Sequence, residues 1–241
     1  MKPVRPDVRL WTGIAAIAVA ALLLTEFLVR AVMGSRPELD ESGALAEFMT
    51  RNSTQTLIII LIDTILMASL IVFLSGFRQI ITHARHDLQW IADIGFGAGL
   101  VFVTVTMVGD AMEAGSALDT VDLRADPSAI RALTEGHIVM FGATGCVLLA
   151  LVSLASGYVT LASRALPAWT GWLALAVGVA NLCWMPSTFG GTSDKSFFSA
   201  GGVGVAVFAT FPWLVWVIAV GIVTIRGRRA RVALRNVGVP A

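Results

Sequence analysis

The stretch LIIILIDTILMASLIVFL, Leu57–Leu74, is apolar enough and nearly long enough to cross a lipid bilayer as a helix. A helix rises about 1.5 Å per residue, so about 20 apolar residues cross a hydrocarbon core about 30 Å thick. Asp63 is the only ionisable residue in this stretch. A charge at the bilayer centre costs at least about 2.5–3.5 kcal/mol, so this carboxyl group is expected to face the interior of a helix bundle.

The rest of the chain has the same character. Of its 241 residues, 56% are hydrophobic and 14% are charged, and the mean hydropathy is +0.81. Soluble domains contain about 25% charged residues. The apolar residues form blocks that predict six spans, at about 10–33, 56–77, 89–112, 136–161, 167–185 and 204–225. We therefore predict an all-α integral membrane protein, a bundle of six transmembrane helices in a single domain over residues 1–241.

The basic residues predict the orientation of the bundle. The N-terminal segment, the second and fourth connecting loops and the C-terminal tail hold eleven of the 17 basic residues: Lys2, Arg5, Arg9, Arg78, Arg85, Arg164, Arg226, Arg228, Arg229, Arg231 and Arg235. Basic segments remain in the cytoplasm. The pattern predicts an N-in/C-in protein whose first, third and fifth loops face outward. The basic tail is interpreted as a topology signal, with contact to anionic lipid headgroups as the alternative; nothing else indicates nucleic-acid binding.

The predicted outer loops are long, and long loops often carry functional surfaces. Within residues 34–55 the sequence predicts a short surface helix at 44–49. In the third loop, Asp126-Pro127-Ser128 predicts the start of a short helix through Leu133, because Asp caps a helix and Pro is favoured in its first turn.

Several further features concern packing. The motif GFGAG (Gly95–Gly99) and Gly157 are expected where helices approach closely. Pro212 is expected to kink the last span. Tryptophans near the ends of the spans predict aromatic belts at the membrane interfaces: Trp11, Trp90, Trp169, Trp172, Trp184 and Trp213.

Polar residues within the spans are candidates for function, and they are Glu26, Arg30, Asp63, Asp93, Asp110, Glu113 and His137. Glu26 and Asp63 each lie seven residues from the outer end of their span, about 10 Å below the interface. Because consecutive spans are commonly neighbours, these two carboxyl groups are predicted to face each other. Asp93 is predicted to form an ordinary ion pair with Arg78 or Arg85 near the inner interface.

Arg30 follows Glu26 by four residues, the favourable spacing for an ion pair on one helix face. Three alternatives remain for Asp63: Arg30 bridges both carboxylates, Asp63 is protonated by desolvation, or a ligand binds there. Asp110 and His137 lie at the outer ends of their spans and are predicted to line the mouth of the same pocket.

These residues predict an outward-facing polar pocket made of Asp63, Glu26, Arg30, Asp110 and His137, which binds a small ligand or handles protons. The alternative is a structural or accessory subunit of a membrane complex, whose polar residues pair internally. A small membrane enzyme or a metal-binding protein is a lesser alternative. No H-x-x-x-H or C-x-x-C motif is present, so no metal site is predicted, and the sequence assigns no catalytic residue or cofactor. The expected partners are the lipid bilayer and either a small molecule or another membrane subunit, and the chain could also form an oligomer.

Two stretches, LLLTEFLVRAVM (Leu22–Met33) and LPAWTGWLALAVGVANL (Leu166–Leu182), resemble a family of bacterial six-span membrane proteins, domain of unknown function 4386. The resemblance implies a six-span fold and, with the charge pattern, the bacterial cytoplasmic (inner) membrane. It implies no activity.

Overall fold

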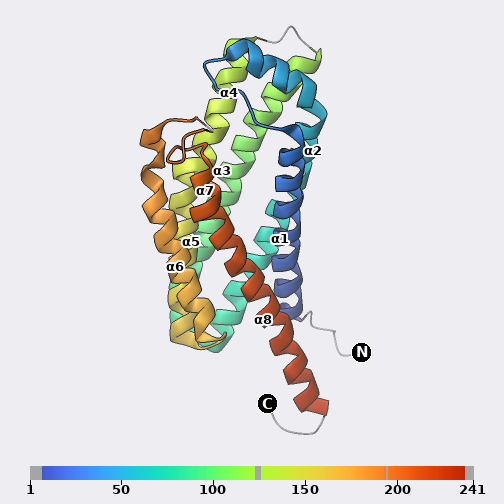
Figure 1. The fold of residues 1–241 in the computed structure, drawn as a ribbon. Helices are drawn as coiled ribbons and strands as arrows, with labels where there is room; N and C mark the ends of the chain where they lie inside the picture. The colour runs from blue at the N-terminus through green and yellow to red at the C-terminus, as the bar shows by residue number, and fades with distance from the viewer. Residues whose placement is uncertain (1–6, 123–125, 194, 237–241) are drawn as a thin grey trace.

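The computed structural model describes residues 7–122, 126–193 and 195–236 (Figure 1). Its regular elements in these ranges are all helical. Six helices within the described residues are long and apolar enough to cross a membrane. The predicted all-α bundle, with six helices suited by length and composition to span a membrane, is therefore confirmed.

Six long helices form a closed ring: α1 (Val8–Met33), α2 (Ser42–Ala84), α3 (Gln89–Asp122), α5 (Gly145–Ser163), α6 (Ala168–Trp184) and α8 (Phe211–Asn236). Each helix packs against the next one in this order, and α8 packs against both α6 and α1. Helix α1 begins and α8 ends at the same end of the bundle, which we call the termini end (Figure 1). The opposite end, where α2 and α4 begin, is called the distal end and corresponds to the side predicted to be outer.

Shorter elements complete the chain: the 3₁₀ turns His86–Leu88 and Met185–Gly190, helix α4 (Pro127–Val139), helix α7 (Val203–Val205), and the π-helical turns Met140–Thr144 and Ala206–Thr210. Helix α4 begins as predicted, because the Asp126 side chain accepts a hydrogen bond of 2.9 Å from the Ser128 N–H. It does not end at Leu133 but continues through the first π-helical turn into α5, so that these three elements make one span.

The distal end is more helical than predicted. The expectation of a loop with a short helix at 44–49 is wrong, because α2 runs without a break from Ser42 to Ala84. The apolar residues Leu45, Phe48 and Met49 share one face of this extension and are buried. They form a second core with residues of the loop before α2, the end of α3, α4 and the segment before α7: Leu39, Ala117, Ile130, Ile138 and Ala200. This distal core stabilises the first turns of α2, which make the helix longer than a membrane span requires.

The main core fills the ring between the termini end and the middle of the bundle. Phe73 of α2 and Trp216 of α8 are nearly fully buried there, with ring centroids 5.9 Å apart in an edge-to-face arrangement. Gly157 of α5 and Gly171 of α6 let these two helices approach closely, since a Cβ on Gly157 would lie 2.9 Å from the Gly171 carbonyl oxygen. The predicted packing role of Gly157 is confirmed.

Both π-helical turns lie in the distal half. The turn Ala206–Thr210 comes directly before Phe211 and Pro212, so the irregularity expected from Pro212 is present as a π-helical turn at the start of α8. The other turn, Met140–Thr144, contains Gly142, whose ψ of −109° is not helical. Single π-helical turns inside α-helices occur frequently at functional sites.

Tryptophans mark only one of the two expected belts. Trp11, Trp90, Trp169 and Trp172 all lie at the termini end and are 55%, 65%, 53% and 65% exposed. Trp184 and Trp213 are buried instead, so their predicted place in an interfacial belt is wrong. Trp184 packs against Phe197, Phe198 and Phe208, and these contacts replace lipid as its surroundings.

Candidate functional site

Apart from Asp93, the polar residues predicted within the spans gather between the main core and the distal core. Arg30 is at the centre of this group, near the distal end of α1. Its Nε donates a hydrogen bond of 2.7 Å to Glu26 Oε1, one helical turn earlier. The predicted ion pair at this spacing is confirmed.

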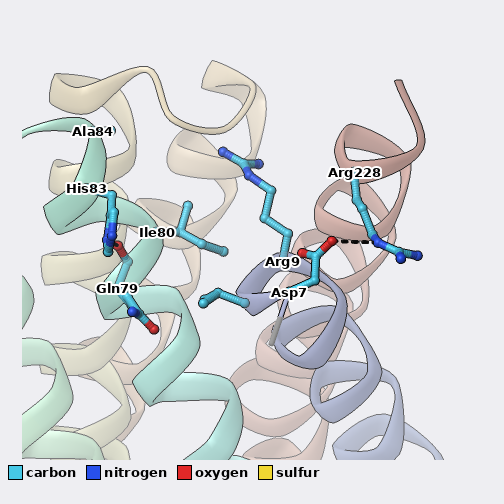
Figure 2. Close-up of a pocket in the computed structure, with 8 residues that line it drawn as sticks. Asp7, Arg9, Gln79, Ile80, His83, Ala84 and Arg228 are labelled. Carbon is cyan, nitrogen blue, oxygen red and sulfur yellow. Dashed lines mark hydrogen bonds and ion pairs between the residues drawn. The ribbon is translucent and has the colours of Figure 1, made fainter. Parts of the chain in front are cut away.

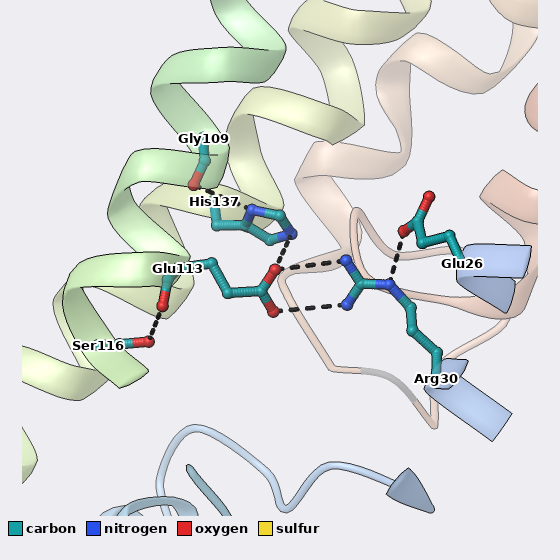
Figure 3. A network of polar contacts seen from close by, with 6 residues as sticks. All are labelled: Glu26, Arg30, Gly109, Glu113, Ser116 and His137. Atoms are coloured by element: carbon teal, nitrogen blue, oxygen red, sulfur yellow. Dashed lines mark hydrogen bonds and ion pairs between the residues drawn. The ribbon is translucent and has the colours of Figure 1, made fainter. Parts of the chain in front are cut away.

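Arg30 also binds a residue that the predicted site left out. Its Nη1 and Nη2 donate to Glu113 Oε1 and Oε2 at 3.4 and 3.3 Å, so the guanidinium holds this carboxylate with two parallel bonds (Figure 3). Glu113 lies one turn beyond Asp110 on α3 and is buried. The sequence did indicate that Glu113 shares a helix face with Asp110, because the two are three residues apart. Its pairing with Arg30 depends on how α1 and α3 are rotated about their own axes, which this spacing does not determine.

His137 joins the network from α4. Its Nδ1 lies 3.1 Å from the Gly109 carbonyl oxygen, and its Nε2 lies 3.3 Å from Glu113 Oε2 (Figure 3). A carbonyl oxygen only accepts, so Nδ1 carries a hydrogen, and a neutral imidazole has only one N–H. The contact with Glu113 is therefore a hydrogen bond only if a further proton sits on Nε2 or on the carboxyl group. This contact responds directly to the gain or loss of one proton.

Of the three alternatives for Asp63, a bridge through Arg30 is not found among the described residues, because the guanidinium of Arg30 binds Glu26 and Glu113 instead. The carboxyl group of Asp63 lies close to that of Glu26, and both side chains line one small cavity, while Arg30 acts on it only electrostatically. The expected facing of Asp63 and Glu26 across α1 and α2 is thus confirmed. Asp63 is 2% exposed, and its Oδ2 has no hydrogen-bond partner among the described residues. A hydrogen bond between two carboxyl groups requires a proton on one of them.

Asp110 does not line the mouth of a pocket, contrary to the prediction. It is 1% exposed and is absent from the lining of the two cavities that reach the polar network. Neither of its carboxyl oxygens has a hydrogen-bond partner within the described part of the chain. Glu113, Glu26 and Arg30 are close enough to act on it electrostatically.

These two cavities adjoin each other. The distal cavity, about 370 Å³, is lined by Glu26, Arg30, Glu113 and His137 and extends to the exposed residue Ser35. The inner chamber, about 70 Å³, lies deeper and is lined by Glu26 and Asp63 among mainly apolar side chains. Both cavities share Glu26, Phe141, Val205 and Thr210 in their walls. Phe141 and Thr210 belong to the two π-helical turns, so these irregular turns lie where the cavities meet.

The inner chamber has an unpartnered donor as well as an unpartnered acceptor. Trp213 Nε1 and Asp63 Oδ2 are both buried without a hydrogen-bond partner among the described residues, and both residues line this chamber. Leaving such a group unpaired costs about 1–3 kcal/mol. The chamber volume of about 70 Å³ holds a few water molecules at about 30 Å³ each. A small polar guest that reached both atoms would satisfy them.

The charges around the site do not balance. Four carboxyl groups lie in the cluster, those of Glu26, Asp63, Asp110 and Glu113. The positive groups near them are Arg30, Arg36 and, when protonated, His137. Even with all three charged, one carboxylate would lack a counterion, and burying such a charge costs several kcal/mol. A bound proton or a small cation removes this cost.

Asp93 and the two cysteines differ in their position relative to the site. Asp93 forms an ion pair with Arg78 at the other end of the bundle, one of the two pairings predicted for it. Cys146 lines the inner chamber, and Cys183 is exposed. No group of three His, Cys, Asp or Glu residues suited to a metal ion is present in the described ranges.

Comparisons with protein-family models, with curated proteins and with solved structures found no match to this chain.

Proposed function

We propose that this chain is a multi-pass membrane protein whose outward-facing pocket exchanges protons and binds a small polar or cationic ligand. Asp63 and Glu26 form the proton-binding pair at the floor. Glu113 and His137 form a second proton-responsive pair, and the Arg30 guanidinium connects the two. Arg30 stays charged at all relevant pH values, so it stabilises both pairs electrostatically without transferring protons itself.

The observation that carries the proposal is the inner chamber. Asp63 and Trp213 line the same small cavity, and each has a buried polar atom, an acceptor and a donor respectively, without a partner among the described residues. Polar groups buried in a purely structural core are normally hydrogen-bonded. The adjoining distal cavity shares four lining residues with the chamber and extends from there to the exposed residue Ser35.

The proposed orientation places both termini in the cytoplasm and the distal cavity outside. It is supported by the eleven basic residues in the N-terminal segment, the even-numbered loops and the tail, because basic segments remain in the cytoplasm. We further propose the bacterial inner membrane, on the resemblance of Leu22–Met33 and Leu166–Leu182 to the bacterial six-span family of domain of unknown function 4386.

Infrared spectroscopy of the protein in lipid nanodiscs tests the proton-binding pair. A carboxylic acid has a C=O stretching band that a carboxylate lacks. We expect such a band at neutral pH, a shift of this band soon after transfer to D₂O, and its loss or displacement in Asp63→Asn. The shift in D₂O reports exchange of the shared proton through the distal cavity.

Asp93→Asn is the matched control, because Asp93 is half exposed and ion-paired with Arg78 at the opposite end. It should leave the acid band unchanged. Absence of an acid band in the wild type, or a band that neither Asp63→Asn nor Glu26→Gln alters, would contradict the proposal. Thermal unfolding of each variant establishes that the fold is retained before its spectrum is interpreted.

A second candidate is a structural or accessory subunit of a membrane complex. The observation in its favour is that Arg30, Glu26, Glu113 and His137 pair internally. In that case the inner chamber serves only packing, and no carboxyl band exchanges rapidly in D₂O. Copurification of a stoichiometric membrane partner from native membranes would favour this function.

A further inference from the structure

A second polar feature lies at the termini end, far from the acidic cluster. Three arginines from separate parts of the chain line one groove of about 590 Å³: Arg9 of α1, Arg164 of the turn between α5 and α6, and Arg226 of α8. The apolar residues Leu166 and Val223 form part of its wall. The groove therefore combines a cationic rim with an apolar surface.

A side-chain hydrogen bond and a tight backbone turn shape this groove. Arg9 Nη2 donates a hydrogen bond of 3.4 Å to the Ala165 carbonyl oxygen, which connects α1 to the α5–α6 turn. Arg164 ends α5 in a left-handed conformation with φ of 52°. The chain then turns so that α6 begins at Ala168, directly after Pro167 of the groove lining. The first turn of a helix carries a partial positive charge, which adds to that of the arginines.

The charged side chains in the lining of this groove are all basic. No carboxyl group is among the described residues that line it. Asp7 lies close by, but Arg228 Nε already binds its Oδ2 at 2.6 Å. Asp7 and Arg228 line a separate cavity of about 350 Å³, which Arg9 also lines (Figure 2). Arg164 and Arg226 form no ion pair with any described residue.

The depth of the groove in a membrane is indicated independently by the exposed tryptophans. Trp11 follows Arg9 by two residues, and Trp169 and Trp172 lie in the first two turns of α6. All three are at least half exposed, and Trp90 is exposed at the same end of the bundle. Exposed tryptophans concentrate at the level of the lipid headgroups. The groove therefore opens where phospholipid phosphates lie.

We infer that the groove of Arg9, Arg164 and Arg226 is a binding site for the phosphate of an anionic phospholipid headgroup. Guanidinium groups bind phosphate oxygens with paired hydrogen bonds. Val223, which is partly exposed, contacts the first methylene groups of the acyl chains, and the buried Leu166 supports the wall beneath it. The site joins α1, the α5–α6 turn and α8, so a bound lipid connects elements that are distant in the sequence.

Native mass spectrometry of the full chain tests this site. The protein is released from nanodiscs that contain equal amounts of phosphatidylglycerol and phosphatidylcholine. We expect the wild type to retain phosphatidylglycerol preferentially and Arg164→Gln/Arg226→Gln to retain it about tenfold less, because each arginine near an anionic surface contributes substantially to binding. The control Arg51→Gln/Arg131→Gln changes the charge equally at exposed distal positions and should retain as much lipid as the wild type.

A second measurement separates lipid from free phosphate. Inorganic phosphate is added to the detergent-solubilised wild type, and thermal unfolding is followed. No stabilisation is expected at millimolar phosphate, whereas phosphatidylglycerol in mixed micelles raises the unfolding temperature of the wild type and of Arg164→Lys/Arg226→Lys. Equal retention of both lipids by the wild type, or equal losses in the groove and control variants, would overturn the inference. Stabilisation by inorganic phosphate alone would overturn the choice of a lipid ligand. If the double glutamine variant does not fold, the two single variants are compared in the same way.

Discussion

Arg30 binds two carboxylates from different helices, so its removal should be costly. In Arg30→Gln, Glu26 and Glu113 lose their shared cation and Glu113 stays buried. Breaking a fully buried ion pair costs about 3–5 kcal/mol. The Arg30 side chain is 30% exposed, so we expect a lower loss, about 2–3 kcal/mol in the free energy of unfolding. Chemical unfolding in mixed micelles measures this loss.

The double variant Arg30→Gln/Glu113→Gln is the internal comparison. It removes the charge that Arg30→Gln leaves buried, and it should recover part of the stability that the single change loses. Arg30→Lys should fall between the wild type and Arg30→Gln, because an ammonium group keeps the charge but cannot form parallel bonds with Glu113. Equal losses in all three variants would argue against a shared electrostatic role.

Trp213 offers a test of whether the inner chamber contains a polar guest. If Trp213 Nε1 donates to a guest, Trp213→Phe loses about 1 kcal/mol beyond the packing change. If the chamber is dry, removing an unpaired buried N–H leaves the protein equally stable or more stable. We expect the loss. The changes Trp213→Phe and Asp63→Asn should also be non-additive, because a guest that bridges both groups couples them.

Close helix packing depends on glycine at some positions and not at others. A Cβ at Gly157 would lie 2.8 Å from the Leu175 side chain and 2.9 Å from the Gly171 carbonyl oxygen. Gly157→Ala is therefore expected to separate α5 from α6 and lower stability by about 1–3 kcal/mol. At Gly97 of α3, no neighbouring atom of the described residues lies within 4 Å of the position that a Cβ would take. Gly97→Ala should be neutral or stabilising by up to about 1 kcal/mol, since alanine favours helix more than glycine does. Thermal unfolding of both variants compares the two positions directly.

The ends of α1 and α8 are connected by the ion pair of Asp7 and Arg228. Burial alone would raise the pKa of Asp7, but hydrogen bonds from Arg228 and from the Leu10 N–H hold that pKa below its ordinary value. A carboxyl group with a lowered pKa stabilises the fold above its unfolded pKa, about 3.9 for Asp, and this contribution is lost as the pH falls through the folded pKa. The Asp7 side chain is 39% exposed, so the contribution is expected to be below about 1 kcal/mol.

Asp7→Asn should therefore be slightly less stable than the wild type at neutral pH and should lose less stability on acidification below about pH 4. Arg228→Gln removes the other partner and should produce the same flattening of the acid limb. Unfolding midpoints measured from neutral pH down to about pH 3, within the range where the lipid mimic is stable, provide the comparison. If both variants still lose stability steeply on acidification, other carboxyl groups are responsible for that loss.

Local spacing was sufficient to predict some contacts, whereas others depend on tertiary packing. The pair of Glu26 and Arg30 follows from their separation along one helix, and the facing of Glu26 and Asp63 follows from equal depth in adjacent spans. The binding of Glu113 to Arg30 depends on the rotation of α3 relative to α1, which hydrophobic blocks do not specify. The extension of α2 from Ser42 was missed because residues 42–55 are too polar for a membrane span and are stabilised as helix by the distal core.

The two ends of the protein are chemically different, and the difference bears on how the acidic site is oriented in the membrane. The distal end places a helical extension and a second core above the acidic cluster. The termini end carries exposed tryptophans and the arginine groove. The proposed lipid site at the termini end and the proposed outward-facing acidic pocket are consistent with one another, because anionic lipids and basic residues both concentrate on the cytoplasmic side.

This orientation is testable by cysteine accessibility in intact cells. The exposed native thiol is removed by Cys183→Ala, while Cys146 is buried. Ser128→Cys then places a thiol at the exposed start of α4, and His86→Cys places one in the exposed turn between α2 and α3. A membrane-impermeant maleimide should label Ser128→Cys in intact cells with the outer membrane permeabilised, and His86→Cys only after the inner membrane is lysed. The opposite result would place the distal cavity in the cytoplasm, where the acidic pocket would exchange protons with the cell interior instead of the exterior.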